Sequence, residues 1–314
     1  MSDSVGRQAV RAHRFDWWRA LVRVLSSIEA VRDGRAMYIL LGSFSGAGLA
    51  LAMAQASFGR GDMRWAIGQG AAALFIAFYG SSAAGLVLMD RAMGLAAREV
   101  ADAVRDALGI GHRVLVTLLV MGLAAASVAA GLLGLYWLSG LPKIGPWLFV
   151  LVVPLTVIVI GLMIMAGMAV VAPLTGPTVW AGASSISAIR TLFRLIRERL
   201  LQSAVLMGGL TLATGVVGAA TSLFVLIGGR VMAEASVLML GVDVQPQVLM
   251  AGLFGYGLHS INSVGIPKEA YPYISAATVG GGVVFALALV LPTLVYLRGV
   301  CEVYLALMAS DQGD

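Results

Sequence analysis

The residues best placed to do chemistry are arginines, in a chain that otherwise avoids charge. In "ASSISAIRTLFRLIRERLLQ", Arg190, Arg194 and Arg197 recur at spacings of four and three, which predicts one face of a helix within 184–200. A guanidinium binds phosphate, and each basic residue near an anionic membrane surface gains about 1 kcal/mol. The pattern also predicts an apolar face turned inward, formed by Ile186, Ile189, Phe193 and Ile196.

A second charged helix is expected over 91–112, with an acidic row at helical spacing: Glu99, Asp102 and Asp106. Three interpretations stay open. The acidic row docks on the arginines within the chain, or both rows are solvated and the arginines contact anionic lipid. In the third, the arginines only hold their loop on the cytoplasmic side and contact nothing specific.

A catalytic origin for these charges is not supported by the spacing. The stretch "DRAMGLAAREVADAVRD" is similar to the signature of the CDP-alcohol phosphotransferases, because it offers Asp90, Arg98, Asp102 and Asp106. That family has Gly directly after its first Asp and a longer spacer, holding a Gly, before its last two acids. Here Arg91 follows Asp90, and only three residues separate Arg98 from Asp102. The match is therefore rejected.

Other reactive groups are sparse. His13, His112 and His259 are far apart in the sequence, and no HExxH, GxSxG or Walker A pattern occurs. The single cysteine, Cys301, has no partner for an intrachain disulfide. We expect no catalytic residue, no metal site and no cofactor.

The elements that position the charged helices must be membrane spans. The chain is 60% hydrophobic and 12% charged, with a mean hydropathy of +0.93, far outside the range of soluble proteins. An all-α integral membrane protein is predicted, with six spans long enough to cross about 30 Å of hydrocarbon. Their cores hold no Asp, Glu, Lys or Arg, and they lie near 37–58, 66–89, 114–138, 147–172, 201–229 and 276–297.

The basic residues predict the orientation of these spans. Sixteen fall on one side: seven arginines in 1–36, four in 91–113, four in 190–199, and Arg298. The other side has five: Arg60, Arg64, Lys143, Arg230 and Lys268. Both termini are therefore expected in the cytoplasm. Only two of the 21 basic residues are lysines, which suggests a GC-rich bacterial genome and a bacterial inner membrane.

The spans are expected to pair as three hairpins with amphipathic cytoplasmic helices. The N-terminal segment, 1–36, carries Trp17 and Trp18 where an interfacial anchor would place them. The six-span domain covers 37–308, and a short tail, 309–314, follows. Within that domain, the periplasmic segment 230–275 is apolar and reads as interfacial or re-entrant helices. Pro154 and Pro292 are expected to kink the fourth and sixth spans.

One stretch resembles a family. In "APLTGPTVWAGASSISAIRTLFRLIRERLLQS", the matching residues are Pro177, Gly182, Ser185, Ala188, Arg190 and Arg197. The pattern resembles polytopic membrane domains attached to some bacterial glycerophosphodiester phosphodiesterases, and related membrane proteins of unassigned function. The family commonly has an acidic residue where Ala181 stands. The resemblance covers about residues 172–203, and it implies an all-helical membrane fold near lipid and no activity.

These observations favour a non-enzymatic bacterial inner-membrane protein, an assembly or accessory component. Its expected partners are anionic lipids of the cytoplasmic leaflet, and a protein partner or a second copy of the chain, with no nucleic acid. The contact residues would be Arg190, Arg194, Arg197, Trp17 and Trp18. The alternative is a carrier or channel for an apolar or lipid-like molecule.

Overall fold

The computed structural model describes residues 15–142, 144–240 and 271–309, and these ranges contain helices and no strands. The prediction of an all-α fold with six apolar spans is confirmed. The elements are α1 (Trp17–Leu25), η1 (Ser26–Arg32), α2 (Gly34–Gly59), α3 (Met63–Ala92), α4 (Val100–Ser139), α5 (Gly145–Ala166), η2 (Gly167–Val171), α6 (Ala172–Trp180), α7 (Ser185–Leu240), α10 (Tyr271–Ala288) and α11 (Val290–Ala309).

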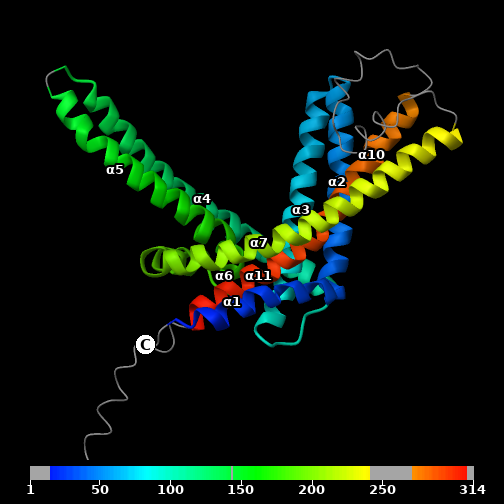
Figure 1. Cartoon of the computed structure of the whole chain (residues 1–314), viewed down its shortest axis with the longest axis horizontal. Coiled ribbons are helices and arrows are strands. Elements are labelled where there is room, and N and C mark those ends of the chain that lie inside the picture. Colours follow the sequence, from blue (N-terminus) through cyan, green and yellow to red (C-terminus); the bar gives the residue numbers. More distant parts are fainter. Residues whose placement is uncertain (1–14, 143, 241–270, 310–314) are drawn as a thin grey trace, which may run out of the picture.

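Three pairs of long helices rise from a common base (Figure 1). They are α2 with α3, α4 with α5, and α7 with α10. The α4–α5 pair leaves the base in a different direction from the other two, and α10 packs on α2. The base consists of α1, η1, α6, α11, residues 93–99 and the first turns of α4 and α7. The predicted segment 230–275 lies outside the described residues from 241 to 270.

The core lies in the base, around the last turns of α3. Every residue from Ser82 to Asp90 is buried there, and the large buried side chains include Leu86, Leu88, Leu294 and Leu307. Just over half (56%) of the most apolar window of α3 is buried, against 11% for the α5 span. Outside the base, the long helices therefore expose most of their apolar surface, as lipid-facing helices do.

Three glycines form the turns that end long helices. Gly61, Gly94 and Gly182 are the three described residues with positive φ, at +82°, +75° and +97°. Each follows the last residue of a helix in a Schellman arrangement: beside Gly94, for example, the Leu95 N–H donates to the carbonyl of Asp90 at 2.8 Å. These turns direct the chain out of α2, α3 and α6 at defined points.

Several predicted boundaries are wrong. The helix expected over 91–112 is not separate, because the Gly94 turn ends α3 and α4 then runs without interruption from Val100 to Ser139. The fifth span extends to Leu240 within α7. The sixth extends past residue 297 and ends at Ala309, so Arg298 lies inside the helix and not beyond its end. Residues 310–314 are outside the described part.

The two prolines behave differently from each other. The helix is interrupted at Leu289, three residues before Pro292, where the sequence predicts a kink of the sixth span. In contrast, α5 continues through Pro154 without a break. The fourth span is interrupted later, where η2 forms a turn of π-helix ahead of Pro173. Turns of π-helix of this kind are frequent at functional or hinged positions.

A hydrogen bond from a neighbouring helix stabilises this interruption. Pro173 has no N–H to donate to the carbonyl of Ala169, four residues earlier. The buried Ser203 hydroxyl of α7 donates to that carbonyl at 2.5 Å. The bond therefore joins the irregular turn of the fourth span to the fifth span, in a part of the chain that water does not reach.

We expect Ser203→Ala to lower the free energy of unfolding by about 1–2 kcal/mol, because it leaves the Ala169 carbonyl buried without this donor. Thermal unfolding in detergent measures the change. Ser127→Ala is the matched control, since the Ser127 hydroxyl is exposed and bonds only its own helix, at Ala124. Equal stability of the two variants would contradict the role given to Ser203.

The helices α2 and α10 cross with their backbones in close contact. A Cβ atom built on Gly48 would lie 2.7 Å from the Gly282 carbonyl oxygen and 2.8 Å from the Ala286 Cβ. The glycine pair that the spacing singles out in this helix, Gly42 and Gly46, is not at that crossing, and a Cβ on Gly42 would have no atom within 4 Å. The register of α2 against α10 therefore depends on Gly48.

Tryptophans are found at both ends of the spans. Trp17 and Trp18 are exposed in α1 at the base, where Trp18 is 75% exposed. Trp65, Trp137 and Trp147 are exposed beside the turns that join the paired helices at their far ends. Exposed tryptophans at both ends of apolar helices are typical of the two membrane interfaces.

Candidate functional site

The acidic row is tied to its own neighbourhood and not to the arginines of α7. Arg98 bonds Asp90 with two nitrogens, Nε at 2.7 Å from Oδ2 and Nη2 at 2.8 Å from Oδ1. Its Nη1 lies 2.8 Å from Asp106 Oδ2. Glu99 and Asp102 are exposed and form no ion pair with any described residue. Internal docking of the acidic row on α7 is therefore not observed.

Arg98 and Asp90 form a partly buried, charge-assisted pair. Asp90 is 5% exposed, and its carboxylate also lies 3.3 Å from the Arg98 backbone nitrogen, which donates to it. The hydrogen bonds to Asp90 outweigh the effect of burial and raise the pKa of Arg98 above its ordinary value. Arg98 therefore stays protonated, and the pair holds the turn after α3 against the start of α4.

A second set of contacts holds the same turn from α2. Asp33 is buried, caps α2 by accepting from the Arg35 and Ala36 N–H groups, and lies 3.0 Å from Arg91. Arg35 donates to the carbonyl of Ala97 at 2.5 Å. These charged groups are bonded to other groups of the base. They therefore stabilise the fold and have few free donors or acceptors for a ligand.

The same holds for the charges of α11. Arg298 lies 2.7 Å from Glu302, and both are mostly buried. Arg298 also donates to the carbonyl of Leu88 at 3.1 Å, so it joins α11 to the end of α3. The sequence predicts Arg298 on the cytoplasmic side just beyond the sixth span, because that span was expected to end at 297. The local signal for a longer helix is the apolar stretch 303–308, which follows the charged pair.

The first part of α7, residues 185–198, is here called the basic segment. It ends at Arg199, whose backbone leaves the helical region (φ −135°, ψ 21°) before the spanning part begins. The Ser187 N–H donates to the Ser184 hydroxyl, which caps the segment's first turn. A helix within 184–200 is therefore present, distinct in direction from the span that follows.

The face that the basic segment buries differs from the predicted one. Ala188, Leu192 and Leu195 are buried, whereas Ile186 and Phe193 are 66% and 60% exposed. Ile189 and Ile196 are half-buried at the edge. Arg190, Arg194 and Arg197 each follow a buried position by two residues, about 200° around the helix. The arginines therefore lie on the side of the helix opposite its buried residues, and none of them forms an ion pair with the acidic row.

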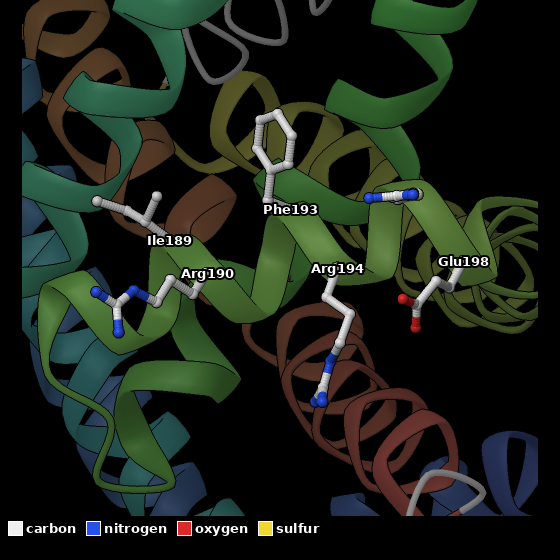
Figure 2. Close-up of a pocket in the computed structure, with 6 residues that line it drawn as sticks. Ile189, Arg190, Phe193, Arg194 and Glu198 are labelled. Atoms are coloured by element: carbon white, nitrogen blue, oxygen red, sulfur yellow. The ribbon is translucent and has the colours of Figure 1, made fainter.

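The basic segment lines a surface pocket of about 420 Å³. Its lining residues are Ile189, Arg190, Phe193, Arg194, Arg197 and Glu198. Figure 2 shows Ile189 and Phe193 pointing to one side of the helix, and Arg190, Arg194 and Glu198 to the other. Arg194 points towards α11. The pocket thus presents an apolar edge and a charged edge on the same helix.

The base offers a second apolar surface in α1. Its buried residues are the small side chains Ala20 and Val24, while Trp18 and Leu25 face outward. In α1, as in the basic segment with Ile186 and Phe193, some of the large apolar side chains point away from the protein.

Comparison with known proteins gives no relative: no family model, curated protein or solved structure matches the chain. The resemblance of residues 172–203 to phosphodiesterase-attached membrane domains thus stays a prediction. Among the described residues, no group of three His, Cys, Asp or Glu side chains is placed to hold a metal ion.

Proposed function

We propose that this multi-span membrane protein is a non-enzymatic component of a bacterial inner membrane that contacts anionic lipid of the cytoplasmic leaflet through its basic segment. The observation that carries the proposal is the pocket of three arginines beside the exposed ring of Phe193. The base, with most of the basic residues of the chain, would face the cytoplasm.

The chemistry of the basic segment supports an interfacial position. An arginine at the centre of a spanning helix costs about 2.5–3.5 kcal/mol, so three in a row would not cross the bilayer. At the interface, the basic segment gains free energy in two ways. Ile186 and Phe193 enter the boundary of the acyl chains, and the guanidinium groups reach lipid phosphates. Trp17 and Trp18 in α1 would anchor the base at the same depth.

The double variant Arg190→Gln/Arg197→Gln tests the proposal. We expect added phosphatidylglycerol to raise the unfolding temperature of the wild-type protein in neutral detergent, less so at high salt. The double variant should lose at least half of that rise. Arg194 is kept because it points towards α11.

The matched control is Arg32→Gln/Arg105→Gln, which removes two exposed arginines of the base outside the pocket. It should keep most of the rise. If both double variants lose it equally, attraction comes from overall charge and the proposed contact is wrong. Labelling of a cysteine introduced at Ser184 from the cytoplasmic side first establishes the orientation, since the native Cys301 is buried.

A carrier or channel for an apolar or lipid-like molecule is the second candidate. It is favoured by the interruptions of the fourth and sixth spans, at η2 and Leu289, because broken helices are common in transporters. Movement of fluorescent lipid between leaflets of reconstituted liposomes would favour the carrier. A stoichiometric copurifying protein would instead point to an assembly role with a protein partner.

A further inference from the structure

The charged edge of the pocket is not purely basic. Arg190, Arg194 and Glu198 follow one another at intervals of four residues, and Figure 2 shows all three side chains on the same side of the helix. Glu198 is exposed and makes no hydrogen bond or ion pair with any described residue. A carboxylate therefore lies in a pocket whose other charged lining residues are arginines, and it pairs with none of them.

This carboxylate would oppose a purely anionic ligand. A phosphate between Arg190 and Arg194 would lie near Glu198, one helical turn or about 5.4 Å further along, and the like charges would repel. A headgroup that carries a cationic amine beside its phosphate turns this repulsion into attraction. The two-carbon link of phosphoethanolamine spans a distance of this order.

The apolar edge indicates that the ligand is a lipid and not a soluble phosphate ester. Phe193 is 60% exposed on the opposite side of the helix, with Ile189 beside it. Exposed apolar side chains of this size gain free energy only by leaving water. Acyl chains beside Phe193 and a headgroup beside Arg190 would fill both edges of the pocket together.

We propose that the pocket binds one phospholipid with a phosphoethanolamine headgroup. Arg190 and Arg194 hold its phosphate, Glu198 its amine, and Phe193 and Ile189 its acyl chains. Arg194 has enough N–H donors to bond phosphate while it faces α11. The inference rests on the proposed lipid contact of the basic segment, and it assigns to this pocket a zwitterionic headgroup in place of a net anionic one.

The test compares three probes on the full-length protein by native mass spectrometry and thermal stabilisation: phosphatidylethanolamine, phosphatidylglycerol with the same acyl chains, and soluble glycerophosphoethanolamine. We expect wild-type protein to prefer phosphatidylethanolamine and to ignore the soluble headgroup. Glu198→Gln should reduce that preference about threefold, in keeping with an exposed ion pair. Glu29→Gln, which changes an exposed glutamate of η1, should leave it unchanged.

The outcomes separate the two proposals. An unchanged lipid ratio in Glu198→Gln, or a wild-type preference for phosphatidylglycerol, overturns the phosphoethanolamine site and leaves the anionic contact standing. If Arg190→Gln/Arg197→Gln binds every lipid as well as wild type, the contact itself is wrong. Binding of glycerophosphoethanolamine as tight as that of the lipid would show a soluble ligand and overturn the lipid site.

Discussion

We expect Arg98→Ala to lower the free energy of unfolding by about 3–5 kcal/mol, a large effect for one side chain. The variant leaves the carboxylate of Asp90, 5% exposed, without the two hydrogen bonds that compensate its burial. It also removes the contact that joins Asp90 to Asp106 of α4. Chemical or thermal unfolding in a fixed detergent measures the loss.

Two further variants show whether the cause is the unpaired charge. Asp90→Leu/Arg98→Leu removes both charges and should recover much of the lost stability, because buried ion pairs replaced as a whole are often tolerated. Arg105→Ala, on the exposed side of α4, should cost less than about 0.5 kcal/mol. A double variant no more stable than Arg98→Ala would contradict this explanation.

Gly48→Val should have the second largest effect, about 3 kcal/mol, because the new side chain meets backbone and not a movable side-chain end. Its Cβ would lie 2.7 Å from the Gly282 carbonyl oxygen, so α10 must move away from α2. A disulfide between cysteines placed at this crossing, in a Cys301→Ser background, should form in the parent chain and fail in the variant.

Gly42→Val is the control on the same helix. A Cβ at Gly42 meets no atom within 4 Å, and the larger side chain should leave both stability and the crossing unchanged. If Gly42→Val were as harmful as Gly48→Val, the effect would come from helix insertion or propensity and not from the crossing.

The sequence predicts the spans well, because the free-energy cost of placing a charge in lipid keeps Asp, Glu, Lys and Arg out of their cores. It predicts their ends poorly. Arg298 and Glu302 interrupt the apolar run of the sixth span, yet they neutralise each other inside the base and α11 continues to Ala309. Composition cannot distinguish such a buried pair from the start of a solvated tail, since the partner contacts come from other helices.

It is harder to predict from the sequence which face of each amphipathic helix packs against the protein. The basic segment has two apolar rows, one containing Ile186 and Phe193 and the other Leu192 and Leu195. In water only one row can be the buried one. Beside a membrane both rows are buried, one in protein and one in lipid, so periodicity alone does not assign them. The predicted assignment chose the row with Phe193, which the structure leaves outside the core.

The position of α3 at the centre of the base sets the order in which the protein is built. The ribosome delivers α2 and α3 before any helix that packs on them, and α11, which reaches α3 through Arg298 and Leu88, comes after all the other described spans. During synthesis, the last turns of α3 therefore stay partly uncovered at the membrane surface until the helices that bury them are made. Assembly of the base is completed only after α11 is translated. Until then, the hairpin of α2 and α3 presents uncovered surface that proteases and chaperones of the membrane can recognise.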